Sequence, residues 1–461
     1  MMTDDALIID QRFGLGARAA ATTPSNSVSL ALLDEFSRYQ ALPPLWQQYQ
    51  QALPSIEQEM QEMRMINQAE SPEDKLQLRR QMRNEARDSY TEAVQVRAQV
   101  AQQTDTPFVE RLVHFWSNHF AISAQKSQVT QLAGLFELQA IRPFVLGTFK
   151  DMLFAVEKHP AMLIYLDQQQ SRGPQSEAVQ RQMRRQPDKK SGLNENLARE
   201  ILELHTLGVR SGYSQQDVTE FARALTGWTV PGPKLTGETD ARYPGFVFNE
   251  RVHEPDVRQL LGKTYAQPGV QQAEAILTDL AAAPATATHV ATKLACHFAG
   301  DQPPPALINR LRDTYLQTGG QLPALYRVLM EAPECRVPTP VKFKTPWEWL
   351  ISSVRALDID LSHVRVSQVM TQLGQPIWKP GSPAGYDDVA ESWLASNALL
   401  RRVEYAQRLA SLTKLSMPPA VLANTVLRGR LSHETLQQVS RAESAHTGFA
   451  LLLVSPEFLR R

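Results

Sequence analysis

The clearest helical pattern in the chain lies between residues 193 and 228. Leu193, Leu197, Ile201 and Leu204 recur at helical spacing, so they share one face when each residue advances the helix by about 100°. Polar residues occupy the adjoining face. The pattern predicts an amphipathic helix that packs its apolar face against the rest of the protein.

A second helix follows after a short turn that contains glycine. Ser214 and Asp217 have the spacing of a capping box, which favours a helix start at this point. Gly227 suits the helix end. The apolar face of this second helix consists of Val218, Phe221, Ala222 and Leu225. The segment therefore predicts a pair of helices joined by a tight connection.

Helical periodicity also covers most of the remaining sequence, with one interruption. Proline and glycine break the pattern between residues 229 and 265, where short strands are expected around 246–248 and near 259–261. The sequence predicts a mainly α, multi-helical globular protein with a small irregular or β insertion. The expected regions are an N-terminal helical region with long polar helices (1–105), a central helical core (106–228), the insertion (229–268) and a C-terminal helical region (269–461).

Two polar segments have patterns of their own. Residues 58–65 and 75–103 are rich in Gln, Glu, Arg and Met, which predicts a long helical hairpin exposed on one side. Such an arm is either a solvated surface or a docking surface, and the solvated surface is the default. Residues 168–190 contain Gly and Pro and little apolar content, so they are expected to form a mobile loop.

Composition excludes several classes of protein. The 48 basic and 48 acidic residues give a net charge of zero, which argues against a nucleic-acid binder. Cys296 and Cys335 are the only cysteines, too few for a disulfide framework or a cysteine zinc site. No apolar run is long enough to span a membrane. The N-terminus lacks the features of an export signal, so a cytoplasmic location is expected; the alternative is export, if the start is misassigned or a signal was removed.

The predicted helix at 193–205 carries the densest group of ionisable residues. Asn196, Arg199, Glu200 and Glu203 lie on one stripe beside the apolar face. His205 falls about 180° from Asn196 and joins the stripe only if the helix bends near its end. A solvated helix face is the simplest interpretation. The alternative is a polar ridge in a pocket, where two carboxylates held by one Arg do acid–base work.

A second group of polar residues lies on the helix that begins at Thr106 and Pro107. Arg111, His114 and Asn118 share a face, whereas His119 is five residues from His114. That spacing does not suit a two-histidine metal chelate, which needs residues four apart. The functional hypothesis places His114 or His119 opposite Glu200 and Glu203; the structural alternative is a pair of hydrogen-bonded core histidines. Arg223, three residues after Glu220, is a further candidate binding residue or a surface ion pair.

Several segments together resemble one protein family. The run NENLAREILELHTLGV followed by GYSQQDVTEFARALTGW resembles the signature of the bacterial family named domain of unknown function 1800. Further similar segments are RFGLGARA at 12–19, ERLVHFWSNHFAIS at 110–123, KHPAMLIYLD at 158–167, LGKTY at 261–265, PATATHVATKLACHFAGDQPP at 284–304, KTPWEWLISSVRAL at 344–357 and LGQPIWKPGSPAGY at 373–386. The resemblance covers nearly the whole chain. It implies a fold class and a grouping of residues, but no reaction.

Two functions follow as hypotheses. Members of the family that the chain resembles tend to be encoded beside a sulfatase-like family, which implies an accessory protein with a sulfatase-like partner. The alternative is a hydrolase, with or without a metal, whose site lies between the 110–120 and 195–205 helices. In that hypothesis Glu200, Glu203, His114 and His119 are catalytic, and Asn196, Arg199, Asn118 and Arg223 bind the substrate. The sequence specifies no cofactor and no metal, and it leaves open whether the protein is an enzyme.

Overall fold

The computed structural model describes residues 2–20, 27–53, 71–186, 192–232, 237–428 and 430–461. Helices account for 63% of it and the strands are few and short, which confirms the predicted fold class. One continuous apolar cluster draws buried side chains from Ile8 to Phe458 and from every part of the chain between them. The division into four regions stays a prediction, because this shared core extends across all of them.

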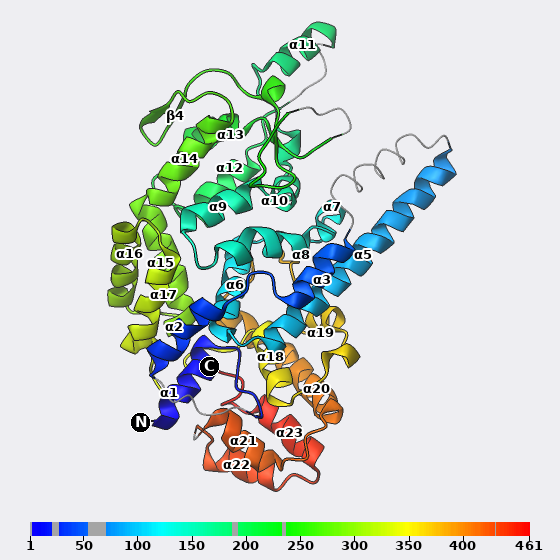
Figure 1. Cartoon of the computed structure of the whole chain (residues 1–461), viewed down its shortest axis with the longest axis vertical. Helices are drawn as coiled ribbons and strands as arrows, with labels where there is room; N and C mark the ends of the chain where they lie inside the picture. Colours follow the sequence, from blue (N-terminus) through cyan, green and yellow to red (C-terminus); the bar gives the residue numbers. More distant parts are fainter. Residues whose placement is uncertain (1, 21–26, 54–70, 187–191, 233–236, 429) are drawn as a thin grey trace.

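The N-terminal third supplies an arm and the first wall of the core. Its helices are α1 (Met2–Leu7), the π-helix η1 (Ile8–Phe13), α2 (Val28–Arg38), α3 (Pro44–Ala52) and α5 (Pro72–Gln103). Residues 86–101 of α5 are largely buried, whereas the first half of α5 is largely exposed. Figure 1 shows this first half extending away from the body of the molecule. The predicted helix at 75–103 is confirmed; its expected partner at 58–65 lies outside the described residues.

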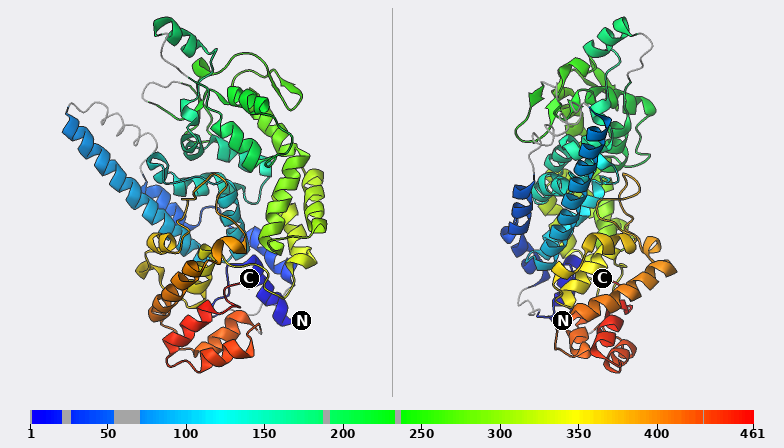
Figure 2. Two further views of the ribbon diagram at one scale, coloured as in Figure 1. Left: turned by 180° about the vertical axis from the view of Figure 1, so that it is seen from behind. Right: turned by 90° about the vertical axis from the view of Figure 1, so that its right-hand side faces the viewer.

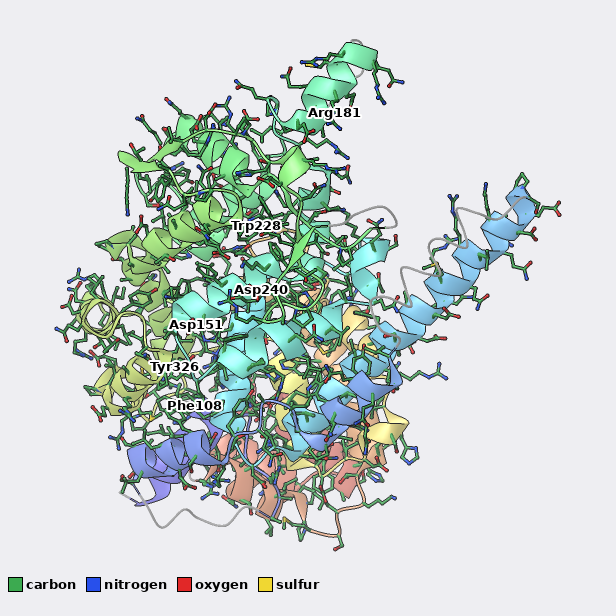
Figure 3. All side chains as sticks on the ribbon, turned by 45° about the horizontal axis from the view of Figure 1, so that its top comes forward. Phe108, Asp151, Arg181, Trp228, Asp240 and Tyr326 are labelled. Carbon is green, nitrogen blue, oxygen red and sulfur yellow. The ribbon has the colours of Figure 1, made fainter. Side chains whose placement is uncertain are left out.

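The central part contains the helices in which chemistry was expected. They are α6 (Pro107–His119), α7 (Ser127–Thr130), α8 (Ala133–Phe136), η2 (Glu137–Ile141), η3 (Arg142–Phe144), α9 (Phe149–Lys158), α10 (Pro160–Tyr165), η4 (Gln168–Gln170), α11 (Glu177–Arg185), α12 (Asn196–Glu200), η5 (Ile201–His205) and α13 (Gln215–Leu225). The expected loop at 168–190 was wrong in part: η4 and α11 occupy much of it. Figure 3 shows α11, with Arg181, projecting from the molecule.

The capping signals of α13 and α6 had different outcomes. Ser214 and Asp217 form the predicted capping box of α13, and Gly227 follows its end with a positive φ of 93°. Thr106 occupies the N-cap of α6, but its side chain makes no capping hydrogen bond. Instead, the carboxylate of Glu35 on α2 accepts hydrogen bonds from the first backbone N–H groups of α6. A neighbouring helix thus satisfies the end of α6.

The insertion contains short strands, as the sequence predicted, and they form two small sheets. Strands β1 (Trp228–Thr229), β3 (Val247–Phe248) and β2 (Glu238–Thr239) pair antiparallel in that order. Strands β4 (Arg258–Leu260) and β5 (Lys263–Tyr265) form a hairpin, and η6 (Glu250–Val252) lies between the sheets. Trp228 and Asp240 of the insertion both lie near Lys158 at the end of α9 (Figure 3).

Helices return after the insertion and continue to the end of the described chain. They are α14 (Val270–Ala282), α15 (Pro284–Ala299), α16 (Pro305–Thr318), α17 (Leu322–Glu331), η7 (Pro333–Cys335), α18 (Pro346–Ala356), η8 (Leu361–His363), α19 (Val366–Gln372), η9 (Ala390–Trp393), α20 (Ser396–Leu412), α21 (Pro419–Leu427), α22 (His433–Ser440) and α23 (Ala445–Val454). Figure 2 shows α20 to α23 gathered at one end of the molecule. In the part of the chain that the structure describes, no helix combines the length and the apolar character needed to cross a bilayer.

Candidate functional site

A cavity of about 320 Å³ lies where α6, α15, α18 and the loop at 375–389 meet. Its volume is at the lower end of the range that small-molecule sites occupy. Four aromatic residues contribute to its walls: Phe115, Trp347, Trp378 and Tyr386. The Pro/Gly-rich loop after residue 373 forms one wall of the cavity.

Asn118 of α6 holds the loop against the helix. Its side-chain amide donates to the backbone oxygen of Tyr386 over 2.8 Å, and its side-chain oxygen accepts from the backbone nitrogen of Tyr386 over 2.7 Å. Gly385 approaches so closely that a Cβ there would lie 2.3 Å from the Asn118 carbonyl oxygen. The amide therefore acts as a two-point clamp that fixes the rim of the cavity.

His114 lies in the cavity wall, and each of its ring nitrogens faces a polar group. Its Nδ1 accepts a hydrogen bond from the indole N–H of Trp347 over 3.1 Å, and its Nε2 lies 3.4 Å from Glu110. Glu110 is itself held by Arg142 through two bonds of 2.8 and 2.9 Å. Burial lowers the pKa of His114. The neutral ring therefore orients Trp347 through Nδ1, while the buried Nε2 faces Glu110 without a hydrogen bond among the described residues.

His119 is the second histidine of α6 that lines the cavity. Its Nε2 lies 3.2 Å from the carbonyl of His205 and must carry the proton to donate to it. Nδ1 is then a buried lone pair without a partner in the described part of the chain. Burial, together with Lys293, lowers the pKa of His119 well below its usual value, so the ring stays neutral and Nδ1 is a hydrogen-bond acceptor.

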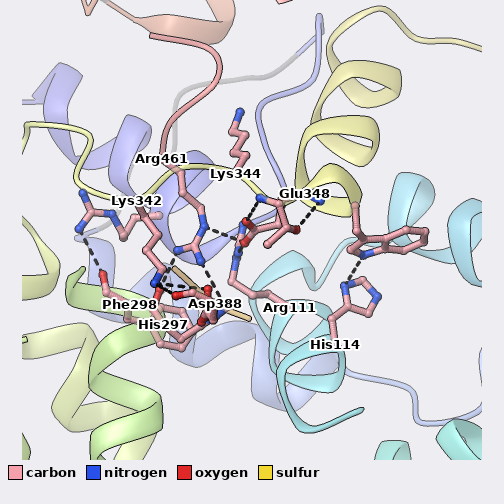
Figure 4. A network of polar contacts seen from close by, with 12 residues as sticks. Arg111, His114, His297, Phe298, Lys342, Lys344, Glu348, Asp388 and Arg461 are labelled. Atoms are coloured by element: carbon pink, nitrogen blue, oxygen red, sulfur yellow. Dashed lines mark hydrogen bonds and ion pairs between the residues drawn. The ribbon is translucent and has the colours of Figure 1, made fainter. Parts of the chain in front are cut away.

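A network of ion pairs forms the floor of the cavity (Figure 4). Glu348 binds the guanidinium groups of Arg111 and Arg461. The guanidinium of Arg461 also donates to the backbone oxygen of His297. The Nδ1 of His297 lies 2.7 Å from Asp388. The two guanidinium groups offset the burial of Glu348 and hold the pKa of its carboxyl well below its usual range. Every charge in this network has a partner, so it holds α6, α15, α18 and the C-terminal residue Arg461 together.

Trp347 and Trp378 are held by a second charged pair. Arg97 of α5 pairs with Glu137 at 2.8 Å, and its guanidinium lies 4.5 Å from the centre of the Trp347 ring and 5.4 Å from that of Trp378. The indole N–H of Trp378 donates to Glu137 over 3.1 Å. Both indoles are therefore oriented rigidly at the cavity.

Lys293 of α15 differs from the other cations that line the cavity. Among the described residues it forms no hydrogen bond and no ion pair, whereas Arg97 and Arg111 are both paired. Its electrostatic neighbours are Asp388, Cys296 and His119. Burial lowers the pKa of its amine. The amine is thus available to a ligand.

The acidic stripe of α12 lies outside this cavity. Asn196 is exposed, and Arg199 pairs with Glu195 at 3.3 Å and with Glu203 at 3.5 Å. Glu200 is half-buried, and burial raises the pKa of its carboxyl. Arg223 pairs with Glu220 at 2.7 Å on α13. None of these candidate residues lines the cavity, whereas His114, Asn118 and His119 do; the roles assigned to all of them stay predictions.

His205 lies between the acidic stripe and the cavity. Its ring is buried, its Nδ1 lies 2.7 Å from Glu157 of α9, and its centre is 6.5 Å from that of His119. His289 of α15 contributes a third ring, 5.8 Å from His119. Across the described ranges, no group of three or more His, Cys, Asp or Glu side chains is arranged to hold a metal ion.

Sequence reasoning missed most of the cavity. His289, Lys293 and His297 recur at spacing four and so lie on one face of α15, but this spacing alone assigns them no role. Trp347, Trp378 and Asp388 gave no local signal, because their importance depends on contacts with residues more than 90 positions away.

One family model matches residues 9–460, nearly the whole chain, and the family is described as "Protein of unknown function (DUF1800)". No curated protein and no solved structure matches the chain.

Proposed function

The chain belongs to the family described as "Protein of unknown function (DUF1800)", and from that premise we propose that it binds a small planar organic anion in the cavity between α6, α15 and α18. The supporting observation is the amine of Lys293, which lines the cavity without a hydrogen bond or ion pair among the described residues. A half-buried cation without a partner favours an anionic ligand, because the ligand supplies the missing charge.

The lining supports the same choice of ligand. The acids Glu348 and Asp388 are already paired with arginine, histidine or lysine, and Asp387 is exposed. The aromatic walls favour a flat body, which stacks on indole and phenol rings. A benzoate-sized carboxylate combines both properties. It fits a volume of about 320 Å³.

Cys296 provides a direct test of occupancy. It is partly exposed and lines the cavity one turn from Lys293, while Cys335 is buried. We expect benzoate and 4-hydroxybenzoate to slow alkylation of Cys296 by iodoacetamide and to raise the melting temperature. Rates are measured by peptide mass spectrometry, with Cys335 as the internal reference. If alkylation of Cys296 is unaffected at saturating ligand, the proposal is wrong.

Two variants of Lys293 separate charge from shape. Lys293→Gln removes the cation and is expected to weaken carboxylate binding at least tenfold, which is about 1.4 kcal/mol. Lys293→Arg keeps the charge and is expected to retain most of the affinity. Calorimetry on the two variants and the parent protein measures this. Equal affinity of the Gln variant would show that Lys293 does not bind the anion.

The accessory role is a second candidate, and the exposed half of α5 is the observation that favours it. Residues 72–85 extend beyond the body (Figure 1), and Leu76 is 47% exposed. A sulfatase-like partner would bind this arm. Arg80→Glu with Arg83→Glu is expected to abolish co-elution of the two purified proteins without changing the melting temperature. Unchanged co-elution of this variant would exclude the arm as the docking surface.

A further inference from the structure

Buried lysines elsewhere in the protein have partners for their amines. Lys158 pairs with Glu274 at 2.5 Å, and Lys342 pairs with Asp301 at 2.7 Å. Lys344 donates to the hydroxyl of Ser352 over 3.1 Å and lies 4.1 Å from the centre of the Phe458 ring. Each of these three amines has a fixed partner.

Lys293 lacks such a partner in the part of the chain that the structure describes, and it is the lysine that lines the cavity. Its amine has no fixed partner among the described residues, and it shares the cavity lining with His119. His119 is close enough that the ammonium of Lys293 lowers the pKa of the imidazole. The amine and the imidazole of His119 therefore influence each other electrostatically, while Nδ1 of His119 is itself buried.

We propose that Lys293 is a reactive amine that forms an imine with the carbonyl group of a small aldehyde or 2-oxo acid bound in this cavity. The inference rests on the proposed function, because the same cavity must first admit the ligand. The ligand class narrows accordingly, from planar organic anions in general to those that carry a carbonyl group.

The reaction needs no further reactant. The nitrogen lone pair forms a C–N bond with the carbonyl carbon, and the carbonyl π electrons move to the oxygen. A proton passes from nitrogen to that oxygen to give the carbinolamine. The hydroxyl then leaves as water with a second proton from nitrogen, and the nitrogen lone pair forms C=N. Both proton transfers run from the lysine nitrogen to the carbonyl oxygen, so no other group is consumed.

Burial supports this chemistry because only the neutral amine attacks a carbonyl. Burial lowers the pKa of Lys293, which increases the fraction of neutral amine at neutral pH. Lys344 is a matched control within the same molecule: its pKa falls to about 7, but it does not line the cavity. A comparison of the two lysines therefore separates access to the cavity from ease of deprotonation.

The test treats the full chain at pH 7 with 4-carboxybenzaldehyde, and separately with glyoxylate, in the presence of cyanoborohydride. The reagent reduces any imine to a stable amine, which peptide mass spectrometry locates. Lys293 is expected to be labelled at least tenfold faster than Lys344 and than the exposed Lys263. Labelling that follows surface exposure alone would overturn the inference.

A parallel arm separates this inference from the proposed function. Benzoate resembles 4-carboxybenzaldehyde but cannot form an imine. If benzoate protects Cys296 while the aldehyde leaves Lys293 unlabelled, the binding site stands and the reactive amine is wrong. If neither compound protects Cys296 and Lys293 stays unlabelled, both proposals fall together. Lys293→Arg serves as the folded control, because it keeps the positive charge and removes the primary amine.

Discussion

At the scale of single residues, the protein buries a set of ionisable side chains, and nearly all of these form ion pairs or hydrogen bonds. Glu348 shows the principle. One carboxylate caps α18 through the backbone nitrogen of Thr345 and also binds Arg111 and Arg461. Because the Glu348 carboxylate makes all three interactions, replacing it would leave buried charges unpaired, which is strongly destabilising. Lys293 differs, because its amine has no such partner among the described residues.

Lys344 makes the stability of the protein depend on pH. Burial and the nearby cations Arg111, Arg461 and Arg402 lower the pKa of its amine to about 7, although Glu348 opposes this shift. In the unfolded chain the pKa is near its usual value of 10.5. Between these values the unfolded state binds more protons than the folded state, so the free energy of unfolding rises with pH. Below pH 7 both states are protonated and the contribution is constant.

Lys344→Met removes this dependence. We expect the parent protein to gain about 2 kcal/mol relative to the Met variant between pH 7 and pH 9, since one unit of pKa corresponds to about 1.4 kcal/mol. Urea denaturation of both proteins at pH 6, 7, 8 and 9 measures the difference. Other titrating groups cancel in the comparison. Parallel curves for the two proteins would mean that Lys344 stays protonated in the fold.

At the scale of elements, the ends and irregular turns of helices were harder to predict than the helices themselves. Helical spacing placed α12 and α13 correctly. It also placed His205 about 180° from Asn196, because it assumed 3.6 residues per turn. The chain instead forms a π-helical turn at Ile201–His205. Burial of His205 against Glu157, 48 positions away, accompanies this turn.

Glu35 illustrates a helix cap that comes from a distant element. Its Oε2 accepts from the backbone nitrogens of Phe108 at 2.8 Å and Val109 at 3.2 Å. Glu35→Ala leaves both donors buried and unpaired, and is expected to cost about 2 kcal/mol. Glu35→Gln keeps an acceptor oxygen and is expected to cost less than half as much. Urea denaturation of the two variants measures this. Equal losses would indicate that the charge matters more than the cap.

Lys158 fastens the insertion to the helical core. Its ammonium lies 4.4 Å from the centre of the Tyr243 ring and 4.9 Å from that of Phe246, and it pairs with Glu274. Lys158→Met keeps the length of the side chain but removes its charge. We expect a loss of about 3 kcal/mol and faster hydrogen exchange in residues 238–248.

Lys263→Met is the matched control for Lys158. Lys263 also pairs with an acid, Asp279, and lies 5.3 Å from the Tyr265 ring, but its side chain is 59% exposed. An exposed pair of this kind contributes less than about 1 kcal/mol. Similar losses for the two variants would show that burial of Lys158 adds nothing.

At the scale of the whole molecule, the cavity is assembled from segments that are distant in sequence. His114 and Trp347 are 233 positions apart, and Asn118 and Tyr386 are 268 positions apart. The sequence predicted that Arg111, His114 and Asn118 share one face of α6, and the structure confirms it, because that grouping depends only on local helical geometry. The identity of what faces them depends on long-range packing, which a single sequence does not specify.

The clamp between Asn118 and Tyr386 gives this assembly a test. Asn118→Asp keeps the size of the side chain but replaces the donor with an oxygen that faces the Tyr386 carbonyl, whereas Asn118→Ala removes both bonds. We expect each variant to lose about 2 kcal/mol of stability and to show faster hydrogen exchange in residues 380–389, while α6 stays protected. Because the loop forms one wall, alkylation of Cys296 is expected to accelerate in both variants. If exchange in the loop is unchanged while α6 becomes exposed, Asn118 stabilises its own helix and the loop is held closed by its apolar contacts instead.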